Sequence, residues 1–219
     1  MSKKIALITG AGSGLGKELA LLFGQDYHIV LVGRTADKLD GVASSLSEST
    51  VITADVADPF SIQKLYDQLS EKKLLPDLLV NNAGVGHFGK AESLSYDRLN
   101  EMMHINAIGP MLLTNTLLTD MKKKQSGIIL NILSTAAQKG KVNETGYVAS
   151  KYAFKGYSES LAKEVAEDGI RVVRAYMGGM NTPFWDHNHY ISDPDRLPAP
   201  KEIAERIYNQ MDQDEIQAS

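Results

Sequence analysis

The chain contains no cysteine, no long apolar run and no large block of like charge. Without cysteine, its 219 residues cannot form disulfides, thiolate metal sites or a thiol nucleophile, and a reducing cytoplasm is the expected location. No apolar run has the length of a membrane span, and only four clearly apolar residues separate Lys4 from Thr9, too few for a signal peptide. A membrane partner is therefore not expected.

Charge and histidine content argue against two further classes of ligand. The formal net charge at pH 7 is −4, and the triplet Lys122-Lys123-Lys124 is interpreted as the solvated end of a helix rather than as a nucleic-acid site. The five histidines have no convincing set of partner ligands, although His187 and His189 stand two positions apart. We expect neither a nucleic-acid partner nor a bound metal.

Short apolar segments alternate with helical patterns along the whole chain. Nearly continuous apolar runs, bounded by polar residues or glycine, are typical of strands buried on both faces. Between them, Thr35 and the pair Asp58-Pro59 have the residue types that start helices. The alternation predicts an α/β fold in which residues 1–219 form one domain, a doubly wound parallel sheet of the Rossmann type. The expected strands are Ile5–Thr9, His28–Gly33, Thr50–Ala54, Leu78–Asn81, Gly127–Leu133 and Arg171–Met177.

A glycine-rich turn follows the first expected strand. Residues 9–16 read TGAGSGLG, and a helical pattern continues from Lys17. Glycine lets the backbone approach a diphosphate closely, and a helix N-terminus supplies free N–H donors. The turn therefore points to a nucleotide cofactor. The spacing Gly10-x3-Gly14-x-Gly16 is not a strict GxGxxG, so a turn that serves only packing stays open as the alternative.

Tyr147 and Lys151 lie four residues apart, on one face of an expected helix. A free tyrosine has a pKa of about 10, and a nearby ammonium would lower that pKa by stabilising the phenolate. Tyr147 could then act as general acid in carbonyl reduction, or as general base in alcohol oxidation. Ser134, at the end of an earlier strand, could orient and polarise the carbonyl. A helix tyrosine whose hydroxyl only bonds a neighbour is the plainer alternative.

The order of three motifs resembles the short-chain dehydrogenase/reductase family. These motifs are TGAGSGLG at residues 9–16, NNAG at residues 81–84 and Tyr147-x3-Lys151, and the likeness runs from about residue 3 to about residue 210. The resemblance implies that Ser134 is the catalytic serine, Tyr147 the proton donor and Lys151 the residue that lowers the tyrosine pKa and holds the nicotinamide ribose. It also implies that Asn106 joins a proton relay through water, unless this residue is only a polar residue inside a helix that bonds backbone.

The cofactor contacts come partly from this resemblance and partly from the end of the second expected strand. A carboxylate there would bind a ribose 2′-hydroxyl, but the chain has Arg34, whose guanidinium suits a phosphate. We expect NADP(H), with NAD(H) as the alternative, and Lys38 as a further contact. If Arg34 is only a surface residue, the lack of an aspartate or glutamate at the end of this strand still favours NADP(H). The expected contacts are Gly10, Ser13, Gly14, Leu15, Gly16, Arg34, Thr35, Asp55, Val56, Asn82, Ala83, Gly84, Tyr147, Lys151, Gly178, Met180 and Thr182.

The sequence departs from the family pattern at two places. Met177-Gly178 stands where the family usually has Pro-Gly, which leaves the following loop less constrained. After an expected helix over Lys201–Met211, only residues 212–219 remain. The sequence therefore predicts that the usual seventh strand is missing, in a naturally short or a truncated member.

These residues together predict an oxidoreductase that reduces a ketone or aldehyde, or oxidises the corresponding alcohol, by hydride transfer. An epimerase or dehydratase that keeps its nicotinamide bound is one alternative, and a nucleotide-sensing module without turnover is another. The segment 178–200 is expected to be an irregular loop that closes over an apolar or aromatic substrate, or packs against a neighbouring subunit. Its aromatic and histidine side chains are Phe184, Trp185, His187, His189 and Tyr190.

Two long helical segments predict self-association. Tyr96–Lys124 and Thr145–Glu167 have apolar residues at helical spacing on more than one side, so one side can pack on the sheet and another on a partner. We expect a homodimer, with a tetramer weak or absent because the seventh strand is missing. The apolar residues in question are Met103, Ala107, Met111 and Thr114 on the first segment, and Phe154, Tyr157, Leu161 and Val165 on the second.

Overall fold

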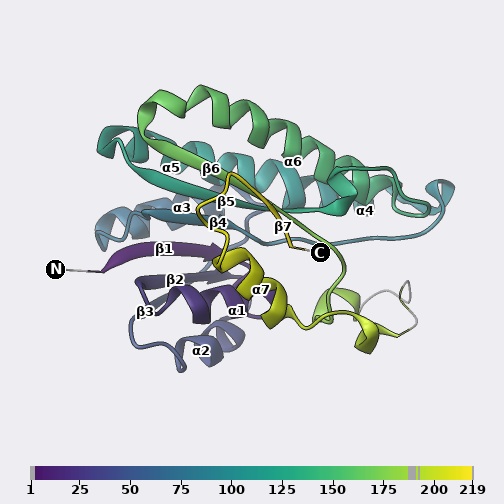
Figure 1. Ribbon diagram of the computed structural model, residues 1–219, viewed down its shortest axis with the longest axis horizontal. Helices are drawn as coiled ribbons and strands as arrows, with labels where there is room; N and C mark the ends of the chain where they lie inside the picture. Colours follow the sequence, from purple (N-terminus) through teal and green to yellow (C-terminus); the bar gives the residue numbers. More distant parts are fainter. Residues whose placement is uncertain (1–2, 187–190, 192, 219) are drawn as a thin grey trace.

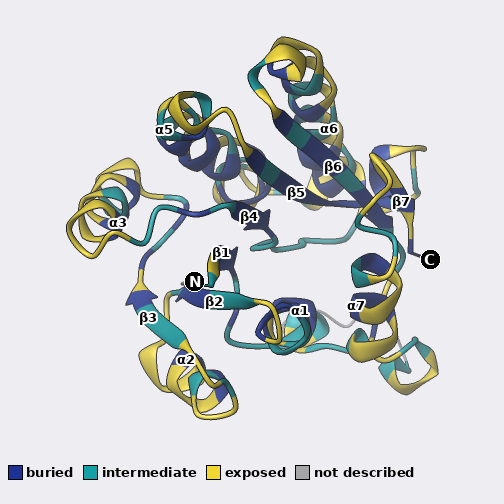
Figure 2. Ribbon diagram, turned by 60° about the vertical axis from the view of Figure 1, so that its left-hand side comes forward, coloured by how far each residue is buried: buried dark blue, intermediate teal, exposed yellow. Residues whose placement is uncertain are grey.

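A parallel sheet of seven strands forms the middle layer of the molecule, in the order β3-β2-β1-β4-β5-β6-β7 (Figures 1 and 2). The computed structural model describes residues 3–186, 191 and 193–218. Apolar side chains occupy consecutive positions in the central strands because both faces of the sheet are covered. The strands are β1 (Lys4–Thr9), β2 (Tyr27–Gly33), β3 (Ser49–Thr53), β4 (Leu78–Asn81), β5 (Gly127–Ser134), β6 (Ile170–Met177) and β7 (Glu215–Gln217).

Helices cover the two faces of the sheet as separate layers (Figure 2). One layer holds α1 (Gly14–Phe23), α2 (Ala36–Ala43) and α7 (Pro200–Tyr208). The other holds α3 (Pro59–Glu71), α4 (Tyr96–Met103), α5 (Gly109–Lys124) and α6 (Thr145–Glu164). A π-helical turn, His104–Ile108, joins α4 to α5. Each layer has its own apolar core against the sheet.

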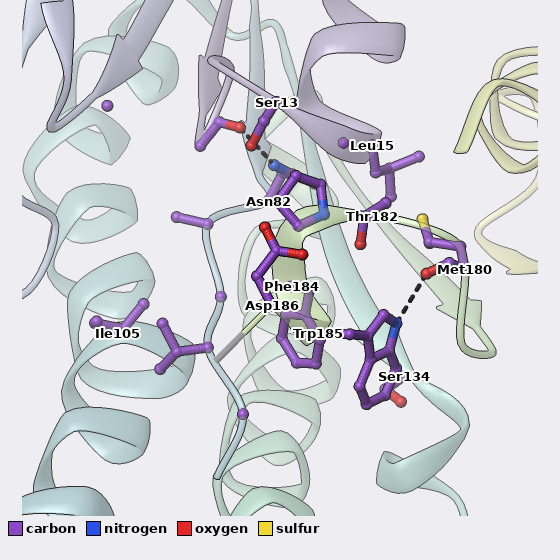
Figure 3. A pocket seen from close by; sticks show the side chains of 18 of the residues that line it. Ser13, Leu15, Asn82, Ile105, Ser134, Met180, Thr182, Phe184, Trp185 and Asp186 are labelled. Atoms are coloured by element: carbon purple, nitrogen blue, oxygen red, sulfur yellow. Dashed lines mark hydrogen bonds between the residues drawn. The ribbon is translucent and has the colours of Figure 1, made fainter. Parts of the chain in front are cut away.

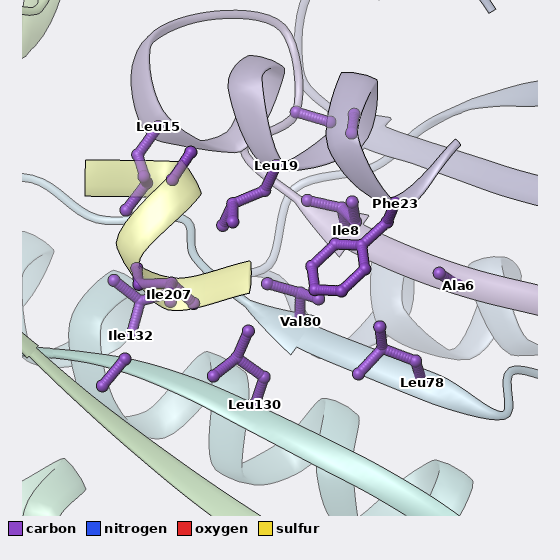
Figure 4. Close-up of a cluster of buried hydrophobic side chains, with 14 of the residues drawn as sticks. Ala6, Ile8, Leu15, Leu19, Phe23, Leu78, Val80, Leu130, Ile132 and Ile207 are labelled. Carbon is purple, nitrogen blue, oxygen red and sulfur yellow. The ribbon is translucent and has the colours of Figure 1, made fainter. Parts of the chain in front are cut away.

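The core under α1 and α7 fixes the position of the glycine-rich turn that precedes α1. Figure 4 shows α1 and α7 packed together over the central strands. Burial of these side chains ties the start of α1 to the carboxyl end of β1. The side chains involved are Leu15, Leu19 and Phe23 of α1 and Ile207 of α7, above Ile8, Val80, Leu130 and Ile132 of the sheet.

The six predicted strands are all present, and their ends differ from the predicted ones by at most one residue. The expected start of α3 is also confirmed, because the Asp58 side chain accepts a hydrogen bond from the Phe60 N–H and Pro59 is the first helical residue. Thr35 precedes α2 as expected but makes no side-chain capping bond, and α2 ends at Ala43.

The prediction that the seventh strand is missing is wrong. β7 pairs with β6 in parallel, and Ile216 is fully buried between two exposed neighbours. The Ala218 N–H donates to the Tyr176 carbonyl at 2.8 Å. Helix α7 ends at Tyr208, earlier than expected, so the residues after it suffice for a turn and a short strand. A strand with one buried apolar residue leaves almost no periodic signal in the sequence.

The strand order reverses between β1 and β4. From β1 the sheet grows outward to β3, and the chain then returns to β4 and grows outward to β7 on the other side. In parallel α/β sheets a ligand binds at the carboxyl ends of the strands beside such a reversal. Within the part of the chain that the structure describes, no helix combines the length and the apolar character needed to cross a membrane.

Candidate active site

A cavity of about 480 Å³ lies at the carboxyl ends of the strands. The glycine-rich turn, the loops after β2 to β6 and the short helical turn Pro183–Trp185 line it. Figure 3 shows the cavity from close by, with Phe184, Trp185 and Asp186 reaching into it from that turn. Among the site residues predicted from the sequence, Gly16 and Asn106 are the two that do not line this cavity.

The glycine-rich turn is packed so closely that two of its positions exclude any side chain. Gly10 has φ +66°, and a Cβ there would lie 2.9 Å from Asn82 Nδ2. A Cβ on Gly16 would collide with the Gly10 carbonyl oxygen. Gly16 therefore lets α1 approach the turn and does not line the cavity. The turn keeps an open backbone surface of the kind that accommodates a diphosphate.

Asn82 ties the loop after β4 to the end of β1. Its backbone N–H donates to Thr9 Oγ1 at 3.0 Å, and its side-chain Nδ2 donates to the Thr9 carbonyl at 2.8 Å. The Ala83 N–H shares Thr9 Oγ1, at 3.1 Å. Two of the predicted motifs, the glycine-rich turn and NNAG, are thus one hydrogen-bonded unit.

The end of β2 presents cations to the cavity. Arg34, Thr35 and Lys38 are exposed and line it. Among the described residues, no carboxylate forms an ion pair with Arg34, so its guanidinium is available to a ligand. At the end of the neighbouring strand β3, Asp55 is held by its own loop, since its Oδ1 accepts from the Ala57 N–H at 2.9 Å.

Ser134, Tyr147 and Lys151 come together on β5 and α6. All three are buried, and the Ser134 hydroxyl lies close enough to the Tyr147 hydroxyl to favour the phenolate. Lys151 Nζ lies 5.9 Å from the centre of the Tyr147 ring and donates to the Ile132 carbonyl at 3.1 Å. The structure therefore brings the predicted serine, tyrosine and lysine to one point in the cavity.

Burial is the largest cause of the pKa shifts of Tyr147 and Lys151. It raises the pKa of Tyr147 to about 12, with the Ser134 hydrogen bond acting in the opposite direction and the Glu144 carboxylate adding to the increase. Burial lowers the pKa of Lys151 to about 8. Lys151 is not among the groups that shift this pKa, and a lowering by Lys151 together with an oxidised nicotinamide stays a prediction.

Asn106 lies in the π-helical turn between α4 and α5 and is buried beside the loop after β4. Its Oδ1 accepts from the Val85 N–H at 2.8 Å, and its Nδ2 donates to the Val85 carbonyl at 2.8 Å and to Ser150 Oγ at 3.0 Å. Asn106 thus holds the Val85 backbone, as in the alternative considered from the sequence. A part in a proton relay stays a prediction.

An aromatic cluster surrounds Tyr147, and the sequence indicated only part of it. The Phe88 and Phe184 rings lie 5.4 Å and 6.0 Å from the Tyr147 ring, and Trp185 stacks on Phe88 at 5.4 Å. Trp185 Nε1 donates to the Met180 carbonyl at 2.9 Å (Figure 3). Phe184 and Trp185 belong to the predicted loop, whereas the single aromatic Phe88 gave no signal of its own.

Two pairs of charged or ionisable side chains on the cavity lining were also not predicted. His87 Nε2 lies 2.6 Å from Glu101 Oε2, and Lys141 Nζ lies 3.8 Å from Glu144 Oε2. The other expected loop residues, His187, His189 and Tyr190, lie outside the described residues. Among the residues described, no group of three or more His, Asp or Glu side chains is arranged to bind a metal ion.

Several known proteins with similar sequences are named as reductases. The chain is 33% identical over 195 residues to sepiapterin reductase of Chlorobaculum tepidum, covering 84% of this chain and 80% of that protein. It is 34% identical over 193 residues to 3-ketodihydrosphingosine reductase of Bacteroides thetaiotaomicron, covering 88% and 70%. It is 35% identical over 187 residues to NADPH-dependent pterin aldehyde reductase of Arabidopsis thaliana, covering 83% and 77%.

A solved structure gives the same fold together with a dinucleotide. A single-residue variant of actinorhodin polyketide ketoreductase with NADPH superposes with a TM-score of 0.87 and 26% identity, over 95% of this chain and 91% of that one. The sequence profile of the family described as short chain dehydrogenase matches residues 4–190. With the three motifs joined in one cavity, the chain belongs to the short-chain dehydrogenase family of oxidoreductases.

Proposed function

We propose that the protein is an NADP(H)-dependent carbonyl reductase in which Tyr147 transfers the proton. The observation that carries this proposal is the meeting of Ser134, Tyr147 and Lys151 in the cavity that the glycine-rich turn also lines. A dinucleotide laid along the turn would reach these three residues. Tyr147→Phe with NADPH oxidation as the assay tests the proposal, as developed in the Discussion.

The residues present fit a dinucleotide. The Gly10–Leu15 turn would hold the diphosphate, Arg34 a ribose 2′-phosphate and Lys151 the nicotinamide ribose. Asp55 and Val56 would flank the adenine, residues 82–84 would lie behind its ribose, and Gly178, Met180 and Thr182 would contact the carboxamide side. The exposed Arg34 and Lys38 favour NADP(H), with NAD(H) as the alternative. The names of two similar proteins, which include NADPH, support the same choice.

The chain's own residues account for the proton. A carbonyl oxygen placed between the Ser134 and Tyr147 hydroxyls would accept hydrogen bonds from both, and Tyr147 would donate its proton as negative charge develops there. The bound cofactor supplies the hydride. With a pKa raised to about 12, Tyr147 stays protonated at neutral pH, which suits the direction of reduction. Asn106 would support this step through the Val85 backbone or through a water.

The surroundings of Tyr147 favour a flat aromatic carbonyl compound as substrate. Phe88, Phe184 and Trp185 offer ring faces and edges to a planar molecule, and the two charged pairs offer polar contacts at its rim. The pterin-related names of two relatives support this choice over the long-chain substrate in the name of the third. NADPH oxidation with aromatic aldehydes, aromatic diketones and long-chain 3-ketones tests it. Faster turnover of the long-chain ketones would contradict it.

We also propose a homodimer through the face formed by α4, α5 and α6. Most of the interface residues named from the sequence are buried within the chain's own core, including Ala107, Thr114, Phe154, Leu161 and Val165. The exposed apolar side chains lie at neighbouring positions, and they are Leu99, Ile108, Leu112 and Tyr152. Because β7 exists, the reason for expecting a weak tetramer is gone. Light scattering of the wild type and of Leu112→Asp distinguishes the states, and equal masses for both would contradict this interface.

A further inference from the structure

Two residues of opposite charge lie in the loop between β5 and α6, directly before Tyr147. Lys141 Nζ is 3.8 Å from Glu144 Oε2 and donates a hydrogen bond to Thr135 Oγ1 at 3.1 Å. Glu144 is only 8% exposed, and Lys141 and Glu144 both line the cavity. Lys141 therefore connects a buried carboxylate next to the tyrosine with the residue that follows Ser134.

The loop that carries this pair is fixed at several points. The Gly89 N–H donates to the Asn143 carbonyl at 2.8 Å, which joins the loop to the one after β4. Asn143 has φ +62°, a left-handed conformation that asparagine tolerates better than most residues. The Val148 N–H donates to the Glu144 carbonyl at 2.8 Å, so Glu144 stands at the start of α6. The charges of the pair are thus held at set positions relative to Tyr147.

The charge of Glu144 opposes ionisation of Tyr147. A negative charge beside a buried phenol disfavours the phenolate, and the Glu144 carboxylate adds to the raised pKa of Tyr147. A nearly buried charge is weakly screened by solvent, so a cation that faces it offsets part of its field. In the loop before α6, Lys141 is the cation that faces Glu144.

Further charged or ionisable groups border the same cavity. Lys151 lies on α6 itself, and His87 and Glu101 form their own pair on the loop after β4 and on α4. Asp186 lies on the segment after β6 and also lines the cavity. These groups are the same in every variant proposed below, so a difference between variants comes from the loop pair.

We propose that Lys141 is a positioning residue, which neutralises Glu144 beside Tyr147 and holds Thr135 next to Ser134. The inference rests on the proposed function, because it concerns the tyrosine that donates the proton there. It goes beyond that function because Lys141, a loop residue outside the Ser134, Tyr147 and Lys151 group, would offset the effect of the Glu144 charge on Tyr147. Without Lys141, the carboxylate would act on Tyr147 with less compensation.

The first test measures the ionisation of Tyr147 without any activity assay. The protein is prepared with 3-fluorotyrosine, whose ring is more acidic than that of tyrosine, and the Tyr147 signal is identified by its loss in Tyr147→Phe. Lys141→Met should move the fluorine titration midpoint upward by about 0.5–1 pH unit. Glu144→Gln should move it downward, and the double variant should resemble Glu144→Gln. Lys139→Met, an exposed lysine of the same loop, is the control without a shift.

The second test uses alcohol oxidation, where Tyr147 must lose its proton. At a fixed pH below the midpoint, Lys141→Met should lower kcat/KM about three- to tenfold, because less phenolate is present. Lys141→Arg, which keeps the charge, and the double variant should recover most of this loss. A double variant as impaired as Lys141→Met, with an unchanged fluorine titration in Lys141→Met, would overturn the proposal and leave Lys141 a loop residue only. A wild type without turnover would refute the proposed function, whereas the fluorine titration would still decide the role of Lys141.

Discussion

Replacing Tyr147 by phenylalanine removes the transferable proton and little else. The phenyl ring keeps its edge contacts with Phe88 and Phe184, because the substitution deletes only the hydroxyl. That hydroxyl lies beside the Ser134 hydroxyl, which accepts a hydrogen bond from the Ala136 N–H at 3.1 Å. The stability cost should therefore be that of one hydrogen bond, about 1 kcal/mol.

The catalytic cost of the same change should be far larger. General acid catalysis contributes about 10²–10⁴-fold, so kcat for carbonyl reduction should fall at least about 100-fold in Tyr147→Phe. NADPH affinity should change less than about threefold, because Lys151 and the glycine-rich turn are untouched. The two quantities are measured by NADPH oxidation and by calorimetric titration of the cofactor.

A matched control separates proton transfer from general damage to α6. Tyr152 lies on the same helix, is 41% exposed and does not line the cavity, so Tyr152→Phe should keep wild-type turnover and stability. Retained turnover in Tyr147→Phe would refute the assignment of the proton donor. An equal loss in both variants would show that the helix, and not the hydroxyl, had been disturbed.

Three further changes test the cofactor site and the burial of the lysine. Arg34→Ala should weaken NADPH binding by about 1.5–3 kcal/mol and leave NADH binding unchanged, and equal losses in calorimetric titrations would contradict a phosphate contact. Gly16→Ala should destabilise the fold by about 1–3 kcal/mol in urea unfolding, because a Cβ would collide with Gly10, whereas Gly156→Ala in open space should not. Burial lowers the pKa of Lys151 to about 8, so the folded protein loses this proton before the unfolded chain does, and stability should rise with pH between about 8 and about 10.5. Lys151→Met should flatten that rise, and an unchanged slope would contradict it.

The sequence was sufficient for most of the sheet and for the groups that meet at its carboxyl edge. Strands such as β4 and β5 are buried on both faces, so their apolar runs stand out from the polar segments around them. The glycines could be predicted because Gly10 and Gly16 have no room for a side chain, a constraint that acts on the residue type itself. Lys151 followed from its spacing relative to Tyr147, and Ser134 from the resemblance to the family.

The parts that the sequence did not reveal depend on contacts between distant loops. Phe88 reaches Tyr147 only after the chain has folded, and Lys141 and Glu144 stand in a segment without periodic pattern. β7 was missed for a related reason, since Ile216 is its single buried apolar residue and its partner strand lies far away in the sequence. Pairing supplied by tertiary structure can specify a strand that local pattern does not.

The environment of Tyr147 bears on the direction of the reaction. A phenol with a pKa of about 12 is almost fully protonated at neutral pH, so it is ready to donate and poorly prepared to accept. An alkoxide forming on the substrate is a stronger base than this phenolate, so the proton moves toward it without further activation. Oxidation would first require the phenolate, and hence compensation of the burial by Lys151, by Lys141 or by a positively charged nicotinamide. The raised pKa thus fits the reduction proposed above, because burial keeps the proton on Tyr147 until negative charge develops on the substrate oxygen.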